Sequence, residues 1–489
     1  MGEQKCPKEG NRPNIIIIQC DSMDGRVMGC MGHTAAHTPN LDRLASKGVL
    51  FKNAYTNSPQ CCPSRASMWS GKYVHTIEAW NNYKGLSEED KTFFSELSQN
   101  GYNVKAFGKT DYLSGYHSLG NRIHAWTRSL NINYEVGRPS AEIIGEDTEI
   151  VNEKDWQAAD ESIQWLKEAN EDKSRPFALY YGIRYPHPPF RTSGRWLNAI
   201  DRGKITVPPY EERLHPCIEY SSRCKNTFGS FSNDEIVDIR RCYYAMVAEV
   251  DALVGRLMDA VYELGIQGNT YIIFTSDHGE MNMEHRLQLK NSMYEASARV
   301  PLIISGPGAE SGAAVEDLCS LIDIYPTLMD IANIPAGEDL QGASLMPELT
   351  GRKSSGRQDW VLSEYHSNFL NTGCFMLRKG KWKYIAYAGY EGQLFDLESD
   401  PEELDNLIQE RPDVAGEMDS ILISIVDYEV VDKKVKEYDR ESFLKWRNGL
   451  SNKEYIKLIS KAYKNQNPEY LTSKIEEWLV QVHAPDICL

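Results

Sequence analysis

The strongest constraint on the fold of this chain is a run of four isoleucines at residues 15–18. An unbroken β-branched run is typical of a strand buried on both faces, and such strands belong to parallel sheets covered by helices. The run leads into an acidic loop that contains Asp21. Open α/β sheets bind ligands beyond the carboxyl ends of their strands, so Asp21 is a candidate ligand residue. The alternative is that it caps a helix.

The alternation of apolar strand and amphipathic helix continues along the chain. It predicts an α/β fold with a mostly parallel sheet sandwiched between helices. Because the carboxyl ends of parallel strands meet at one edge, we expect the loops that carry Lys109, His187 and Asp277 to lie near Asp21. The predicted strands are residues 49–55, 101–107, 176–181 and 270–275, and the predicted helices are residues 40–48, 92–100, 155–169 and 233–264.

A polar, linker-like run at residues 351–358 divides the chain into two predicted parts. Residues 1–350 are expected to form the α/β domain, and residues 351–489 a small C-terminal subdomain. Alternating residues on both sides of a Lys-Gly turn predict a β-hairpin in this second part, which makes it an antiparallel α+β unit. The predicted strands of the subdomain are residues 374–378, 381–387 and 393–397.

Composition excludes some classes of protein. The chain has 489 residues, of which 41% are hydrophobic and 25% charged, as in an ordinary globular protein. Its net charge of −17 argues against a nucleic-acid binder. No stretch approaches the roughly 20 apolar residues of a membrane span, so no membrane partner is expected. The start of the chain lacks an apolar signal core, and its 11 cysteines lack metal-type spacing. A cytoplasmic location is expected, or an exported one if a signal was removed.

Residues 58–71 predict a turn that runs into a short helix. Pro63 suits the first turn of that helix and Gly71 its end, so Cys61 is expected just before the helix N-terminus. Backbone N–H groups and the helix dipole favour an anion there, and Arg65 could add a charge-assisted hydrogen bond. The alternative is that Cys61 and Cys62 are ordinary small buried residues.

The order Cys61, Pro63, Ser64 and Arg65, followed by Gly71, resembles the signature of the type I sulfatases. This resemblance implies an alkaline-phosphatase-like fold and oxidation of Cys61 to formylglycine by the formylglycine-generating enzyme. It extends to about residue 405. The flanking runs most resemble sulfatases that remove the 2-sulfate of a glucuronate, which implies a sulfated sugar of glycosaminoglycan origin as substrate. These runs are residues 53–58, 68–71 and 80–82.

The same resemblance implies a divalent metal site. Asp21, Asp277 and His278 would bind Ca²⁺ or Mg²⁺ together with the formylglycine of Cys61, since oxygen ligands suit these ions. The family often has a second Asp directly after the first and an Asn after the later one, and this chain has neither. Asp24 is a candidate replacement ligand.

Three cations and a histidine are expected around the sulfate. Lys290 resembles the family lysine that contacts it, and Lys109 matches a Gly-Lys turn, although Asp111 stands where a His is usual. With Arg65 these lysines would neutralise the sulfate oxygens. His187 matches the histidine that protonates the leaving alcohol. The alternatives are a solvated lysine and a structural histidine.

A uronate substrate also carries a carboxylate, which needs contacts beyond those used by the sulfate. Candidate contacts are Tyr112, His117 and His366, and the alternative for His366 is a surface position. Competing functions are a generic arylsulfatase, a phosphonate or phosphodiester hydrolase on the same fold, and an inactive binding protein if Cys61 stays unmodified.

Overall fold

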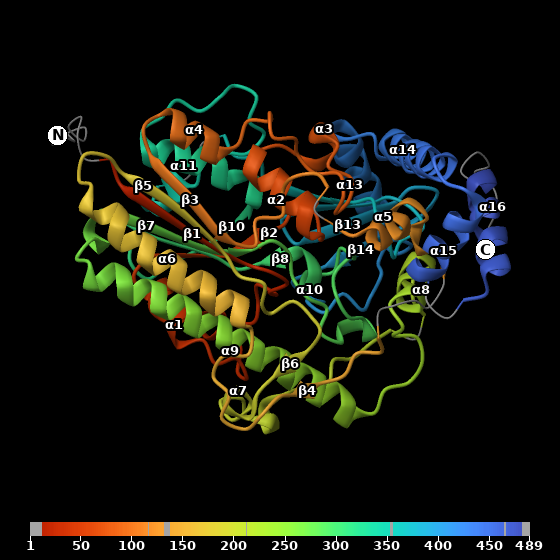
Figure 1. Ribbon diagram of the computed structural model, residues 1–489, viewed down its shortest axis with the longest axis horizontal. Coiled ribbons are helices and arrows are strands. Elements are labelled where there is room, and N and C mark those ends of the chain that lie inside the picture. The colour runs from red at the N-terminus through yellow and green to blue at the C-terminus, as the bar shows by residue number, and fades with distance from the viewer. Residues whose placement is uncertain are drawn as a thin grey trace.

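The computed structural model describes residues 12–481, apart from residues 116, 132–136, 212, 353–355 and 464–465. The start of the chain, from which the missing signal core is inferred, lies outside the described residues. The same holds for the middle of the polar run at residues 351–358. Figure 1 shows a large sheet between layers of helices and a second sheet near the C-terminal end of the chain.

The large sheet has eight strands in the order β10-β2-β9-β7-β1-β5-β3, with β8 beside β2. Strand β1 lies near its centre and pairs in parallel with β5 and β7. Strand β9 pairs antiparallel with β2 and β7, so the sheet is mixed but mostly parallel. The strands are β1 (Asn14–Cys20), β2 (Val49–Tyr55), β3 (Asn103–Gly108), β5 (Phe177–Gly182), β7 (Thr270–Ser276), β8 (Arg299–Val300), β9 (Leu302–Ser305) and β10 (Ala313–Ser320).

Helices cover both faces of this sheet, as predicted from the isoleucine run. Ile16 and Ile18 pack in the core that includes α1 (Pro39–Ser46), α6 (Glu153–Glu171) and α9 (Asn233–Glu263). Ile15 and Ile17 face the opposite core. Successive strand side chains point to opposite faces of the sheet. Because helices cover both faces, all four isoleucines are fully buried. The helices of the second core are α2 (Cys61–Ser70), α4 (Phe93–Gln99) and α11 (Ile324–Ala332).

The second sheet is antiparallel and has the order β11-β12-β13-β14. Its central hairpin is the predicted one, while the strand β11 (Trp360–Tyr365) lies at its edge. Apolar residues of this sheet pack against residues 281–298 of the first part, including Met293 and Tyr294. The two sheets therefore share a core. The other strands are β12 (Cys374–Lys379), β13 (Trp382–Tyr387) and β14 (Tyr390–Asp396).

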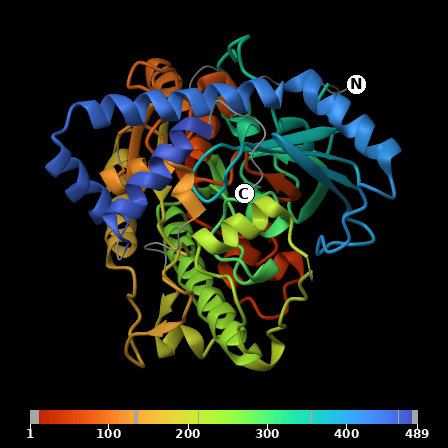
Figure 2. The ribbon, with the colours of Figure 1, turned by 90° about the vertical axis from the view of Figure 1, so that its right-hand side faces the viewer.

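Four further helices at the end of the chain were not predicted from the sequence. They lie outside both sheets, at the end of the molecule that carries the second sheet (Figure 2). Residues of the last three pack together with α5 (Leu119–Trp126) in one apolar cluster. They are α13 (Pro412–Ile425), α14 (Tyr428–Asn448), α15 (Asn452–Ala462) and α16 (Pro468–Gln481).

Short elements complete the described part of the chain. Among the described residues, no helix combines the length and the apolar character needed to cross a bilayer. The short elements are α3 (Val74–Ile77), β4 (Glu142–Ile143), β6 (Arg191–Thr192), α7 (Gly194–Leu197), α8 (Pro216–Cys224), α10 (Glu295–Ala298) and α12 (Met346–Leu349).

Candidate active site

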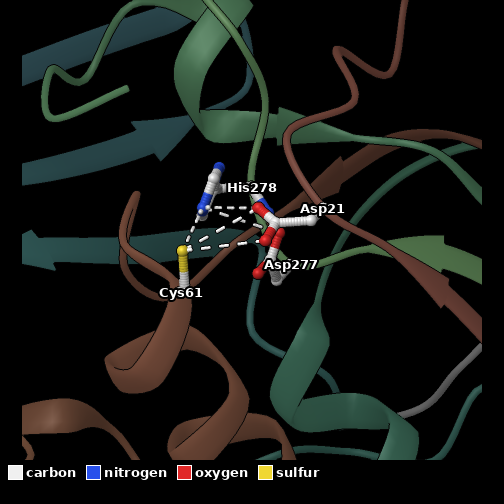
Figure 3. A group of neighbouring side chains, drawn as sticks. All are labelled: Asp21, Cys61, Asp277 and His278. Atoms are coloured by element: carbon white, nitrogen blue, oxygen red, sulfur yellow. Dashed lines mark hydrogen bonds and ion pairs between the residues drawn. The ribbon is translucent and has the colours of Figure 1, made fainter. Parts of the chain in front are cut away.

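Four buried side chains meet at the carboxyl ends of β1 and β7 (Figure 3). They are Asp21, Cys61, Asp277 and His278, here called the edge cluster, and their ligand atoms lie within 4.8 Å of one another. The register of the sheet explains why they meet. The last residue of β1 pairs with the last residue of β7, so Asp21 and Asp277 leave the sheet side by side. The prediction that these loops converge is confirmed.

Cys61 is the first residue of α2, one position further into the helix than expected. Gly71 ends the helix with φ of 69°, a left-handed conformation that glycine adopts without a steric penalty. The Cys61 Sγ lies 3.3 Å from Nε2 of His278 and 3.8 Å from an Asp21 oxygen. The thiol therefore points into the edge cluster from the positive end of a helix.

The two adjacent cysteines have opposite surroundings. Burial and Asp21 raise the pKa of the Cys61 thiol, but nearby cations outweigh them and hold this pKa well below its usual value. Burial raises the pKa of the Cys62 thiol well above its usual value, and its Sγ lies 3.9 Å from the carbonyl of Leu113. Only the first cysteine is in the edge cluster. The cations around Cys61 are Lys109, Lys290 and His278.

Arg65 does not have the sulfate-facing position that the sequence suggests. Its side chain is fully buried, and Nε forms an ion pair with Asp277 at 2.8 Å. The guanidinium also donates to the hydroxyl of Tyr180 at 2.7 Å and to the backbone carbonyl of Lys109 at 3.0 Å. Because Arg65 is one helical turn beyond Cys61, it lies beneath the edge cluster and orients Asp277 from there.

Lys109 follows β3 and forms an ion pair with Asp21. Burial raises the pKa of Asp21, but Lys109 and the other cations outweigh burial and hold it well below the usual value. Gly182 makes this approach possible, because a Cβ there would lie 1.9 Å from the carbonyl oxygen of Lys109. Lys109 is thus held at the rim of the edge cluster by the neighbouring strand.

The two candidate substrate contacts near Lys109 are half-buried. Asp111 lies 3.4 Å from the Lys109 ammonium and 3.0 Å from Nε2 of His117. His117 is therefore linked to Lys109 through Asp111. Tyr112 stacks on Trp69 of α2 with ring centroids 4.0 Å apart.

His187 and Lys290 are in direct contact, although 103 residues separate them. The Nε2 of His187 lies 2.6 Å from Nζ of Lys290. Lys290 is buried, with an exposed fraction of 6%. The Nδ1 of His187 lies 2.6 Å from the carbonyl of Pro188, so Nδ1 carries a hydrogen and donates it. Nε2 is thus the nitrogen that faces Lys290.

His366 is neither a surface residue nor placed as a substrate contact. It is 1% exposed, and its Nε2 lies 3.0 Å from Glu364. Trp80 and Phe375 pack edge-on against its ring. The other oxygen of Glu364 lies 2.9 Å from Nδ1 of His75. The expectation from sequence fails because β11 is covered by packing that the local sequence does not reveal.

Asp24 is not a replacement ligand. It pairs with Arg26 at 2.7 Å, and Arg26 pairs in turn with Glu284 at 2.7 Å. The donor set of the edge cluster nevertheless fits a divalent cation, since it offers two carboxylates and an imidazole. Burial and the charge of Asp21 raise the pKa of Asp277, and the ion pair with Arg65 offsets this rise only in part.

A helix-covered, mostly parallel sheet with a nucleophile position at a helix N-terminus and buried metal-type ligands defines a hydrolase of the alkaline-phosphatase-like class. A family model described as Sulfatase matches residues 13–334, and one described as N-sulphoglucosamine sulphohydrolase, C-terminal, matches residues 283–425. The chain belongs to the sulfatase family, and the family resemblance of its sequence is confirmed.

Individual proteins are similar over nearly the whole chain. Arylsulfatase K of Homo sapiens is 39% identical over an aligned length of 508 residues. The alignment covers 98% of this chain and 94% of that protein. A phosphonate monoester hydrolase of Agrobacterium radiobacter has a TM-score of 0.72 and 26% identity, covering 84% of this chain and 95% of its own. The structure of BT1596, a 2-O GAG sulfatase, has a TM-score of 0.70 and 25% identity, covering 86% and 94%. The chain is therefore a sulfatase, an enzyme that hydrolyses sulfuric esters.

Proposed function

We propose that this sulfatase removes the 2-O-sulfate from a glucuronate or unsaturated uronate of glycosaminoglycan origin, using a formylglycine at position 61. The observation that carries the catalytic part is the position of the Cys61 Sγ, 3.3 Å from His278 in the edge cluster. The substrate part is supported by the similarity to Arylsulfatase K and to a 2-O GAG sulfatase. A sulfated sugar and the formylglycine-generating enzyme are the partners that this function requires.

The modified residue and the metal would each supply one kind of chemistry. A formylglycine hydrate has two hydroxyls, one to attack sulfur and one to expel sulfate as the aldehyde re-forms. Ca²⁺ or Mg²⁺, held by Asp21, Asp277 and His278, would favour ionisation of a hydroxyl beside it. Arg65 keeps Asp277 in place for this role through their buried ion pair.

The remaining residues act on the sulfate and on the leaving sugar. Lys109 and Lys290 place positive charge near Cys61, where they balance charge on the sulfate oxygens. His187 holds a hydrogen on Nδ1 through the Pro188 carbonyl, so Nε2 is the atom that donates a proton to the departing sugar oxygen. Lys290 contacts the same nitrogen at 2.6 Å.

A second candidate function is hydrolysis of a phosphonate or phosphodiester. It is favoured by the similarity to the phosphonate monoester hydrolase of Agrobacterium radiobacter, because sulfuryl and phosphoryl groups are nearly isosteric. Side-by-side kinetics on an aryl sulfate and an aryl phosphodiester separate the two. A preference for the phosphodiester would reject the sulfated-sugar proposal.

The uronate specificity is tested with matched sugars. We expect 2-sulfated glucuronate, or its unsaturated form, to have a kcat/KM about 10- to 100-fold above that of the matching neutral sugar sulfate, the effect of one charge-assisted contact. The variant His117→Asn should narrow this ratio, whereas His366→Asn should leave it unchanged because that ring is buried. Equal kcat/KM on both sugars would reject the uronate and leave a generic arylsulfatase.

A further inference from the structure

Lys290 lies between two residues with left-handed backbone conformation. Leu289 has φ of 63° and Asn291 has φ of 77°. Asparagine tolerates this region, but a leucine gains nothing local that offsets the steric clash of its Cβ. A strained conformation of this kind persists only where the surrounding structure holds it, and it recurs at functional sites.

Each residue of this tripeptide, residues 289–291, is held by one buried side chain. The carboxylate of Glu280 accepts from the backbone N–H of Leu289 at 2.5 Å. The ammonium of Lys225 donates to the backbone carbonyl of Lys290. The hydroxyl of Tyr365 accepts from the Asn291 side-chain amide at 2.9 Å. These three side chains belong to residues that are fully buried, and they come from the loop after β7, the end of α8 and β11.

Lys225 is the unusual member of the three. Burial, with a smaller contribution from the charge of Lys290, lowers the pKa of its ammonium to about 7, and Glu280 opposes the change. Within the described part of the chain, no carboxylate lies within ion-pair distance of Lys225. Gln288 donates to the backbone carbonyl of Lys225 at 2.7 Å. The segment of Lys225 and the segment of Lys290 therefore each donate a hydrogen bond to the backbone of the other. Burial of a lysine ammonium without a carboxylate partner costs free energy, which points to a role other than stability.

The position of the tripeptide sets the position of the Lys290 side chain. Relaxation of Leu289 or Asn291 to an ordinary φ would turn Lys290 away from the 2.6 Å contact with His187. We propose that Lys225 is a positioning residue of the sulfatase reaction, which holds Lys290 against His187 through the Lys290 backbone carbonyl. This inference rests on the proposed roles of Lys290 and His187.

A double-mutant cycle on the full-length enzyme tests it, with 4-nitrophenyl sulfate and a sulfated sugar as substrates. We expect Lys225→Met to lower kcat on the order of 10- to 100-fold with little change in KM, since it removes a contact that matters in the transition state. In the Lys290→Ala background the same change should lower kcat less than about 3-fold. Additive losses would overturn the proposal.

The leaving group gives a readout that a merely structural role would not change. A sugar alcohol needs protonation more than 4-nitrophenol does, so Lys225→Met should slow the sugar sulfate more than the aryl sulfate. Equal loss on both substrates would overturn the proposal. The aryl sulfate assay does not depend on uronate specificity. A wild-type enzyme inactive on every sulfate ester would instead reject the proposed function.

A second variant tests the proposal independently if Lys225→Met fails to fold. Tyr365→Phe removes the hydroxyl that accepts from Asn291 and donates to the Asn368 carbonyl. We expect kcat to fall about 3- to 10-fold, the effect of losing the hydrogen bond to Asn291. The matched control is Tyr271→Phe, whose buried hydroxyl donates to the Pro307 carbonyl at 2.5 Å from the start of β7, the end of the sheet away from the edge cluster. Equal effects of Tyr365→Phe and Tyr271→Phe on kcat would overturn the proposal.

Discussion

The protein contains two groups of buried charges that are built differently. The edge cluster brings Asp21 and Asp277 together with a histidine and a cysteine. The second group, here called the junction cluster, joins Glu295 of α10 to the four-stranded sheet. Its Lys383 lies 2.9 Å from Glu295 and 2.7 Å from Glu403, and all three are buried.

The junction cluster is complete within the protein. Glu295 also accepts from the hydroxyl of Tyr55 at 2.9 Å, and its backbone N–H donates to Glu403 at 2.6 Å. Burial raises the pKa of Glu295, but Lys383 and Arg299 outweigh burial and lower it. Burial leaves the pKa of Glu403 raised.

The edge cluster has the same pattern, since nearby cations outweigh burial and lower the pKa of Asp21, while that of Asp277 stays raised by burial. The two clusters differ in how their carboxylates are arranged. Lys383 bridges both glutamates of the junction cluster, whereas Asp21 and Asp277 pair with separate cations and converge with Cys61 and His278 as metal-type ligands.

The largest difference is expected at the two cysteines. Cys61→Ala should lower kcat on the order of 10⁴-fold or more because the nucleophile position is lost, whereas Cys62→Ala should keep most of the activity. Steady-state kinetics and thermal unfolding of both variants measure this. Peptide mass should show residue 61 about 18 Da lighter than cysteine, since SH₂ is lost and oxygen gained. Comparable losses in both variants would contradict the assignment.

Removal of divalent cations should have the next largest effect on turnover. Chelation should abolish turnover while the protein stays folded, and added Ca²⁺ or Mg²⁺ should restore it. At a cation concentration 100 times its Kd, the free energy of unfolding should rise by about 2.7 kcal/mol. Asp277→Asn should lose both responses. Full activity in chelator would show that the edge cluster does not need a metal.

Substitutions in the junction cluster should change the free energy of unfolding instead of turnover. Lys383→Met leaves Glu295 and Glu403 without their shared cation, so the free energy of unfolding should fall by about 3–5 kcal/mol in urea titrations. The matched control is Lys379→Met in the same sheet, because its partner Asp359 is largely exposed and the pair should contribute less than about 1 kcal/mol. Similar losses in the two variants would mean that the junction cluster is not a stabilising unit.

The smallest effect is expected in the pH dependence of the His75–Glu364 pair. Burial lowers the pKa of His75, but Glu364 outweighs burial and raises it above 6.5. The pKa of Glu364 is lowered to about 2, so this carboxylate stays charged above pH 5. The stabilisation by His75 is thus fully present below pH 6.5 and is lost as the pH rises through its raised pKa.

The measurement is urea unfolding of the wild type and of His75→Gln from pH 5 to pH 9. The difference in unfolding free energy between the two should shrink as the pH rises. A difference that stays constant over this range would show that the ion pair with Glu364 is not responsible.

The sequence predicts strands β1, β2, β3, β5 and β7 of the first sheet, because burial on both faces leaves apolar runs that can be recognised locally. It does not predict β8, β9 and β10 of the same sheet. It also predicts the edge cluster, since parallel strands such as β1 and β7 end at one edge. The direction of Arg65 could not be predicted, because it depends on Asp277, 212 residues away. The role proposed for Lys225 could not be predicted either, because it depends on Lys290, 65 residues away. Helix α15 did have a signal, the capping box formed by Ser451 and Glu454.

The order in which the chain is made has a consequence for Cys61. The loop before it is closed by a hydrogen bond from the Asn57 side chain to the Leu362 carbonyl, 305 residues later. In the folded protein Cys61 is only 3% exposed, so an enzyme that oxidises it needs the unfolded chain. At about 5–20 residues per second, synthesis of the intervening chain takes about 15–60 s. Ribosomal speed therefore sets the time during which the oxidation that we propose can precede burial.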